Sequence, residues 1–365
     1  MARDLATAER DPGLRIAMLI LELLRHAARS NGPDGSGQVS EALTRASDSE
    51  FKWAVEAGLG PLLLRTVRDQ STLIPVSRYE VLLSSDLTAR LLHALRIDAA
   101  TEVIDACASF GAPVTLLKGI SISEQYYPEG HLRTMSDVDL LLPVEAIPVV
   151  EAELLRRGYG RGPEHPGEDS HHGAPLLDRE RQVWIELHKG LFPRSSGLLS
   201  GEAFGAASIA ARSEESRCCG RAVYRLSDEF QAAYLAATWV LDLTLCKFHP
   251  SFATALFDAV LLQRKARPTV NWDQVLDWLD NEMALASLHL MLSYLTRHGI
   301  CKPAPPDRLA RAQSLVGGVA LPIMHAVLDR YLLGARAWTL PIPPPVPGRY
   351  NLRRQFLKRA LRRSY

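Results

Sequence analysis

Two aspartates, Asp137 and Asp139, stand one residue apart at the start of an apolar run that ends in three leucines. A strand sends alternate side chains to opposite faces, so both aspartates would share one face while Val138 points into the core. Carboxylates at the mouth of a buried strand repel each other unless a cation lies between them. Hard divalent cations such as Mg²⁺ take oxygen ligands of this kind and complete their coordination with substrate phosphates. The segment predicts a metal site for phosphoryl or nucleotidyl transfer, and the plainer alternative is a solvated strand end.

A third carboxylate of the same kind occurs further along the chain. The residues from Gln182 to His188 predict a strand on which Glu186 and His188 share one face, because apolar residues alternate with them. Glu186 is predicted to bind the metal and to accept the proton of an attacking hydroxyl. The alternative is an ordinary surface glutamate on an alternating strand. His188 is predicted either to bind substrate or to be a hydrogen-bonded structural residue.

Another apolar strand, predicted for residues 114–117, ends at Lys118 and Gly119. Glycine allows the backbone to approach a ligand closely, and a short helix beginning at Gly119 would present its backbone amides to an anion. Lys118 offers a point charge and Arg133 a planar fork to phosphate, and Ser121 adds a hydroxyl. The pattern predicts a phosphate site, against the alternatives of a simple turn at the glycine and surface salt bridges at the two basic residues.

Together these segments resemble a bacterial family described as uncharacterised nucleotidyltransferase, within the DNA polymerase beta-like nucleotidyltransferase superfamily. The motifs that carry the resemblance are Leu-Leu-Lys118-Gly119, Tyr127-Pro128, Arg133, Ser136-Asp137-Val138-Asp139-Leu and Ile185-Glu186-Leu187-His188. The resemblance covers roughly residues 50 to 300. It implies that Asp137, Asp139 and Glu186 are catalytic metal ligands. The nucleotide-binding candidates are Lys118, Gly119, Ser121, Arg133 and Ser136.

The resemblance also implies a reaction. An NTP, with ATP favoured, would give its nucleoside monophosphate to an acceptor hydroxyl or amine and release pyrophosphate. The expected cofactor is Mg²⁺ or Mn²⁺, and the acceptor is expected to be a small molecule or a peptide rather than RNA. The first turn departs from the superfamily pattern, because Ile120 follows Gly119 where a small residue is usual. A catalytically inactive binding or regulatory protein of the same fold therefore stays open.

A third hypothesis is a toxin-like nucleotidyltransferase that modifies tRNA. Its support is the C-terminal tail from Arg349 to Tyr365, which carries seven Lys or Arg residues and no acid. Clustered basic residues attract nucleic acid, although a solvated chain end has the same composition.

Four histidines, at positions 165, 171, 172 and 188, raise the question of zinc. Their spacing matches no zinc-ligand pattern, and His171 and His172, as neighbours on a strand, would point in opposite directions. A substrate-binding loop that carries His171 or His172 is the preferred functional interpretation.

Composition excludes several classes of protein. The 42 basic and 41 acidic residues nearly balance, so no global charge favours nucleic acid or a membrane surface. The most apolar segment, Tyr234 to Cys246, is too short to span a bilayer, which takes about 20 apolar residues. The charged first twelve residues do not resemble a signal peptide. Five cysteines without Cys-x-x-Cys spacing then favour the cytoplasm.

The predicted fold class is α+β: a small mixed nucleotidyltransferase-type sheet with helices, flanked by N-terminal and C-terminal helical regions. The predicted domains are a helical region at 1–110, an α/β core at 111–225, a helical domain at 226–340, and a Pro-rich linker with the basic tail at 341–365. One long helix or two short ones are expected between Tyr79 and Phe110, and the leucine stripe on this segment is predicted to be core. Its members are Leu82, Leu83, Leu87, Leu91, Leu92 and Leu95. The oligomeric state stays open.

Overall fold

The computed structural model describes residues 12–29, 36–68, 74–162, 169–244, 253–265 and 270–300, together with residues 321, 325, 328 and 329. His165, the Pro-rich linker and the basic tail lie outside the described residues. The chain forms two compact units. The sheet unit comprises Thr88–Gln231 and Trp278–Asn281, and the helical unit comprises Met1–Leu87, Ala232–Asp277 and Glu282–Tyr365.

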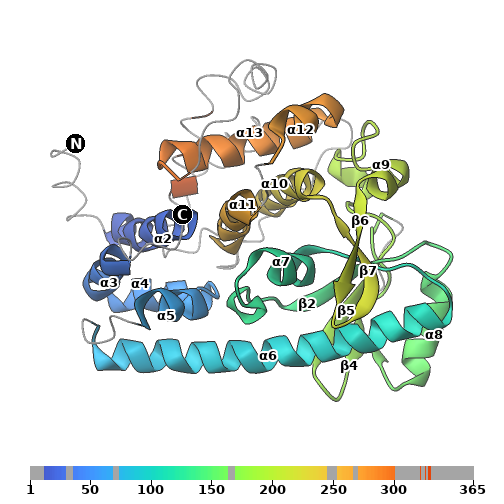
Figure 1. Ribbon diagram of the computed structural model, residues 1–365, viewed down its shortest axis with the longest axis horizontal. Helices are drawn as coiled ribbons and strands as arrows, with labels where there is room; N and C mark the ends of the chain where they lie inside the picture. The colour runs from blue at the N-terminus through green and yellow to red at the C-terminus, as the bar shows by residue number, and fades with distance from the viewer. Residues whose placement is uncertain are drawn as a thin grey trace, which may run out of the picture. The chain divides into compact units, whose positions relative to one another are not determined.

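Within the described residues, a seven-stranded mixed sheet forms the framework of the sheet unit, in the order β3-β4-β5-β2-β1-β7-β6. The strands are β1 Thr115–Leu116, β2 Asp137–Leu141, β3 Gly160–Arg161, β4 Leu176–Asp178, β5 Val183–His188, β6 Ser213–Cys218 and β7 Arg221–Leu226. Strand β2 is parallel to β5 and β1 is parallel to β7, while the other neighbours are antiparallel. The strands gather beside the C-terminal half of α6, Val76–Ser109 (Figure 1). The predicted α+β class is confirmed.

The main core of the sheet unit lies on one face of this sheet. Val138 and Leu140 of β2 are fully buried in a cluster with Val103 of α6 and Val150 of α8, Ile147–Arg156. Burying a side chain of this size stabilises the fold by about 1.5–3 kcal/mol. Because side chains alternate along a strand, packing of Val138 and Leu140 turns Asp139 to the opposite face. The apolar half of β2 thus determines where its carboxylates lie.

The expected elements around the aspartates are observed. The strands predicted at 114–117 and 182–188 appear as β1 and β5, and the strand predicted to carry Asp137 and Asp139 appears as β2. The helix predicted after Lys118 is α7, Lys118–Tyr126. The remaining helical segments of this unit are η3 Gly130–Leu132, η4 Arg194–Ser196 and α9 Ala206–Ala211.

The hairpin of β6 and β7 has no counterpart in the sequence-based prediction. Strand β6 reads Ser-Glu-Glu-Ser-Arg-Cys and lacks apolar alternation, because it lies at the edge of the sheet and buries only Cys218. Cys218 pairs with Arg221, so the turn consists of Cys219 and Gly220, with φ values of +47° and +80°. Two left-handed residues in a two-residue loop are typical of a type I′ turn, in which asparagine or aspartate usually precedes the glycine.

The helical unit contains three short helices between residues 36 and 68, within the region predicted to be helical. Ser47 begins the second of them because it forms a capping box with Glu50, in which each side chain accepts a hydrogen bond from the other's backbone amide. Gly58, with φ of +78°, follows that helix. The helices that lie wholly or partly in this unit, besides α6, are α2 Pro12–Ala28, α3 Ser36–Arg45, α4 Asp48–Glu56, α5 Gly60–Val67, α10 Asp228–Thr244, α11 Thr254–Lys265, α12 Trp272–Trp278 and α13 Glu282–Arg297.

The leucine stripe of α6 is mostly not core, so that prediction is wrong. Leu82 is buried, but Leu83, Leu87, Leu91 and Leu92 are between 40% and 62% exposed. These leucines follow helical spacing on a 34-residue helix, but helical spacing alone does not show which apolar residues a neighbouring element covers. Among the described residues, none of the helices has the length and apolar character that crossing a membrane requires.

Candidate functional site

The centre of the site is the parallel pairing of β2 and β5. In this register Asp139 lies opposite Glu186, and Leu141 lies opposite His188. Because Glu186 and His188 are two residues apart on β5, both side chains share the face that carries Asp139. The donor atoms of Asp139, Glu186 and His188 lie within 4.8 Å of one another. Their chemistry, two carboxylates and one imidazole, can hold a divalent cation.

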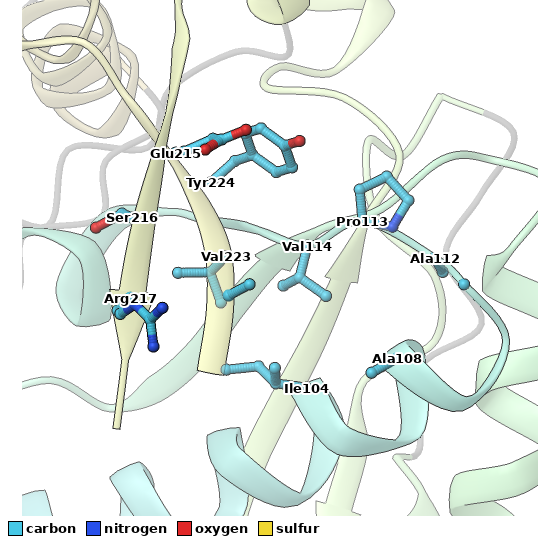
Figure 2. Close-up of a pocket in the computed structure, with 12 residues that line it drawn as sticks. Ile104, Ala108, Ala112, Pro113, Val114, Glu215, Ser216, Arg217, Val223 and Tyr224 are labelled. Carbon is cyan, nitrogen blue, oxygen red and sulfur yellow. The ribbon is translucent and has the colours of Figure 1, made fainter. Parts of the chain in front are cut away.

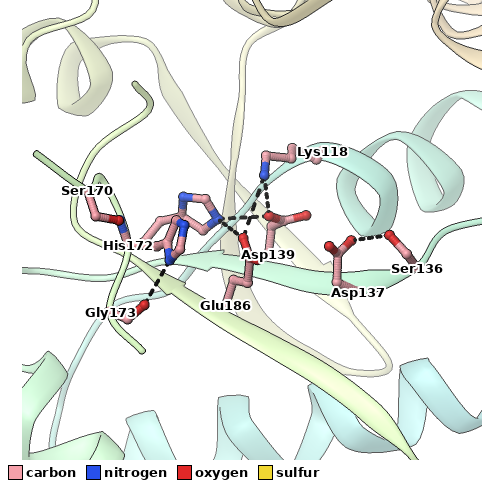
Figure 3. Close-up of polar contacts among 9 residues, drawn as sticks. Lys118, Ser136, Asp137, Asp139, Ser170, His172, Gly173 and Glu186 are labelled. Atoms are coloured by element: carbon pink, nitrogen blue, oxygen red, sulfur yellow. Dashed lines mark hydrogen bonds and ion pairs between the residues drawn. The ribbon is translucent and has the colours of Figure 1, made fainter. Parts of the chain in front are cut away.

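Lys118 supplies a positive charge between the two carboxylates (Figure 3). Its Nζ lies 2.6 Å from Asp139 Oδ1 and 3.9 Å from Glu186 Oε2. The residue starts α7 directly after β1, with φ of +44°. A left-handed conformation in a non-glycine residue costs about 1–3 kcal/mol and occurs preferentially at functional sites. The sequence pattern predicted Lys118 as a phosphate ligand, and its contact with Asp139 was not foreseen.

His188 is fully buried, and its Nε2 is the atom that faces the carboxylates. Nε2 lies 2.8 Å from Asp139 Oδ1 and 3.4 Å from Glu186 Oε2. Its other ring nitrogen, Nδ1, is buried and has no hydrogen-bond partner among the described residues. Burial opposes protonation of this ring, as does Lys118, but the hydrogen bonds to Asp139 and Glu186 outweigh both and raise the pKa of His188. The ring is thus directed into the site.

The three carboxyl groups differ in their electrostatic surroundings. Burial works against ionisation of Asp139, but Lys118 and His188 outweigh it and lower the pKa of this carboxyl. The hydrogen bond from His188, more than any other contact, lowers the pKa of Glu186. Burial, with repulsion from Asp139 next in size, raises the pKa of Asp137 to about 6. The site therefore holds two stabilised carboxylates and one that is electrostatically strained.

Asp137 lies on the same side of β2 as Asp139, as the alternation predicted (Figure 3). Its Oδ1 accepts a hydrogen bond from Ser136 Oγ at 3.0 Å. It lies opposite Trp184 in the strand pairing, two residues before the Asp139 pair, and does not belong to the group of donor atoms described above. Its role as a metal ligand stays a prediction.

Gly119 and Ser121 make contacts within the protein. A Cβ atom on Gly119 would lie 2.8 Å from Met135 Cβ, so glycine is needed here for close packing. Ser121 is fully buried, and its Oγ accepts a hydrogen bond from Gln125 Nε2 at 2.7 Å. A nucleotide-binding role for either residue stays a prediction.

Arg133 and Ser136 flank the start of β2. Arg133 Nη1 donates a hydrogen bond to the carbonyl oxygen of Thr134, and Ser136 donates to Asp137 as described above. Their assignment to the nucleotide is likewise a prediction.

His171 and His172 both contact His188, although neighbours on a strand were expected to diverge. The His171 and His172 ring centroids lie 5.1 and 5.6 Å from that of His188, and 5.0 Å from each other. The segment is not a regular strand but makes one isolated bridge, between His172 and His188, so alternation does not apply. His172 Nδ1 lies 2.8 Å from the carbonyl oxygen of Gly173. Burial, followed by the effect of His188, lowers the pKa of His171 to about 3.

A separate cavity of about 580 Å³ lies beside the end of α6 and the β6–β7 hairpin (Figure 2). Ile104, Val114 and Val223 are among its apolar lining residues, and Glu215 and Arg217 are among its polar ones. None of the predicted site residues lines this cavity. It is therefore distinct from the carboxylate site.

Comparison with known proteins adds one finding. A family model described as uncharacterised nucleotidyltransferase matches residues 47–298, which is more than half of the 365-residue chain. The matched region contains Lys118, both aspartates, Glu186 and His188. No curated protein matches the chain.

Proposed function

Because the chain belongs to the uncharacterised nucleotidyltransferase family, we propose that it moves a nucleoside monophosphate from an NTP to an acceptor hydroxyl or amine. A member of this family is a transferase of phosphorus-containing groups. The observation that carries the proposal is the placement of Asp139 opposite Glu186 on parallel strands, with Lys118 Nζ 2.6 Å from Asp139. Paired carboxylates beside the ammonium of a long side chain are suited to a metal–triphosphate substrate.

Asp139 and Glu186, with Asp137 beside them, would hold the divalent ion, either Mg²⁺ or Mn²⁺. When bound, such an ion supplies charge stabilisation at the phosphates. Lys118 offers its ammonium to the triphosphate, and Arg133 and the start of α7 are the further candidates for phosphate contacts. Ser121 and Ser136 complete the proposed nucleotide-binding set.

In the proposed step, the acceptor oxygen or nitrogen forms a bond to the α-phosphorus of the NTP. The bond between the α-phosphorus and the oxygen bridging to the β-phosphorus breaks, and pyrophosphate leaves with that electron pair. Glu186 accepts the acceptor's proton, because it is the more exposed carboxylate of the Asp139–Glu186 pair and because the hydrogen bond from His188, which lowers its pKa, keeps it ionised before the step.

The finer assignments extend this proposal. We assign ATP as the favoured donor, a small molecule or a peptide as the acceptor class, and the DNA polymerase beta-like superfamily as the wider relationship. The cytoplasm is the proposed location, and the free thiols of Cys107, Cys218 and Cys219 fit a reducing compartment.

One observation favours a second candidate, a non-catalytic binding or regulatory protein. The Lys118 ammonium already neutralises Asp139, so a cation of the chain itself stands where a metal would bind. For the tRNA-modifying alternative, the supporting basic tail lies outside the described residues.

The test is titration calorimetry of ATP, GTP, CTP and UTP into the protein with Mg²⁺ or Mn²⁺ present. We expect one nucleotide to bind the wild type and the Asp105→Asn control, whose carboxyl is exposed and paired with Arg221. Binding should be lost in Asp139→Asn. Asp137→Asn is a second variant in which nucleotide binding should be lost. It should fold well, because the substitution removes an unfavourable charge. Absence of binding by a folded wild type would contradict the proposal.

A further inference from the structure

The donor set of the site contains a nitrogen as well as oxygens. His188 Nε2 lies 2.8 Å from Asp139 Oδ1 and 3.4 Å from Glu186 Oε2, on the face shared by all three side chains. A nitrogen in this position is within reach of any ion that both carboxylates bind, because the three donor atoms lie within 4.8 Å of one another. The ring therefore has to be counted among the donors of the site.

The burial of His188 indicates that its orientation is imposed by the fold. The residue is fully buried, lies on β5 between its hydrogen-bonded neighbours β2 and β4, and directs Nε2 at the carboxylates. Its backbone is held as well, since its carbonyl oxygen accepts a hydrogen bond from Leu142 N at 3.0 Å. Its Nδ1 has no hydrogen-bond partner among the described residues, so all the ring's observed polar contacts run through Nε2 into the site.

We infer that His188 is a metal ligand and that the site binds Mn²⁺ in preference to Mg²⁺. Mg²⁺ favours oxygen donors in near-ideal octahedral geometry. Imidazole nitrogen suits first-row transition metals, and carboxylate oxygens suit Mn²⁺ as well as Mg²⁺, so Mn²⁺ accepts both donor types. Mn²⁺ also accommodates the six-coordinate geometry in which substrate phosphates can occupy open positions.

The cation site itself is marked by Lys118. Its ammonium lies 2.6 Å from Asp139 Oδ1, which shows that the site accepts a positive charge at close range. A divalent ion bound there competes with this ammonium for Asp139. Each additional protein ligand raises the affinity of the site for the ion and so favours the ion over the ammonium. The nitrogen of His188 gives this advantage to Mn²⁺ more than to Mg²⁺.

The inference rests on the proposed function, because the same carboxylates hold the ion in both, but it concerns metal binding alone. The experiment is electron paramagnetic resonance of Mn²⁺ added to the full chain after chelator treatment, without nucleotide. The decrease of the free Mn²⁺ signal gives the affinity. Electron spin-echo modulation then detects ¹⁴N nuclei coordinated to the bound ion.

We expect ¹⁴N modulation in the wild type. In wild-type protein produced with ¹⁵N-histidine, a ¹⁵N pattern should replace the ¹⁴N pattern, which identifies a histidine as the ligand without any mutation. His188→Gln should remove the modulation and weaken Mn²⁺ binding about 10-fold or more. The matched control His93→Gln, which replaces an imidazole paired with Glu124, should retain both. Mg²⁺ should displace bound Mn²⁺ only when present in at least about 10-fold excess.

Bound Mn²⁺ without ¹⁴N modulation in the wild type, equal affinities for the two ions, or no Mn²⁺ binding would each overturn the inference. The outcome is separate from that of the nucleotide titration. Modulation from His188 without nucleotide binding would leave this inference standing and refute nucleotidyl transfer. Nucleotide binding with Mg²⁺, without nitrogen coordination to bound Mn²⁺, would support the proposed function and overturn this inference.

Discussion

Asp137 should destabilise the metal-free protein, so replacing it by asparagine should stabilise the fold. Burial and repulsion from Asp139 raise the pKa of this carboxyl from 3.8 to about 6. A raised folded-state pKa means that the native state binds the proton more tightly than the unfolded state does. Between the unfolded and folded pKa values the stability therefore falls as pH rises, and the penalty is complete above pH 6.

The magnitude follows from the difference of about two pKa units, which corresponds to about 3 kcal/mol at pH 7.5 as an upper limit. The asparagine side chain of the Asp137→Asn variant would keep the oxygen that accepts from Ser136 Oγ while removing the charge. We therefore expect this variant, in the presence of chelator, to unfold at higher urea than the wild type by about 1–3 kcal/mol at pH 7.5. The gain should shrink toward zero below pH 4.

Urea denaturation followed by circular dichroism at pH 7.5, 5.5 and 4 measures this effect. Asp105→Asn serves as a control of opposite sign, because the hydrogen bond from Arg221 lowers the pKa of the Asp105 carboxyl. That carboxylate stabilises the fold above its unfolded pKa, so its removal should slightly lower stability at pH 7.5. An unchanged or lower stability of Asp137→Asn at pH 7.5 would refute the electrostatic account of the site.

Two further substitutions examine the surroundings of the carboxylates. Gly119→Ala places a Cβ 2.8 Å from Met135 Cβ and should destabilise the fold by about 1–3 kcal/mol in urea; a neutral variant would contradict the packing argument. Lys118→Met removes the ammonium from Asp139, so the metal-free protein should melt earlier and gain more thermal stability from Mn²⁺ than the wild type does. An equal Mn²⁺-induced shift in Tm would indicate that Lys118 and the ion do not occupy the same position.

The part of the site that depends on strand alternation could be predicted from the sequence. Asp137 and Asp139 share a face of β2, and Glu186 and His188 share a face of β5, because the side chains of a strand alternate with a period of two residues whatever its neighbours are. The resemblance to the uncharacterised nucleotidyltransferase family is confirmed by the family model that matches residues 47–298. Local periodicity was sufficient to predict which of these side chains share a face of their strand.

Features that depend on tertiary pairing could not be predicted. The contact of Lys118 with Asp139 requires β1 to end beside β2 and the lysine to adopt a positive φ, and neither is encoded in a local pattern. The polar edge strand β6 carries no apolar alternation to identify it. His171 and His172 both contact the His188 ring, but the segment that carries them pairs with β5 only by an isolated bridge between His172 and His188. Regular strand alternation therefore does not predict these contacts.

The most direct test of nucleotidyl transfer is calorimetric titration of the wild-type protein with each NTP in the presence of Mn²⁺ or Mg²⁺. We predict metal-dependent binding of one nucleotide that Asp139→Asn abolishes and Asp105→Asn leaves unchanged. Binding that survives in Asp139→Asn, or no binding of any nucleotide by the folded wild type, would contradict the assignment of this site.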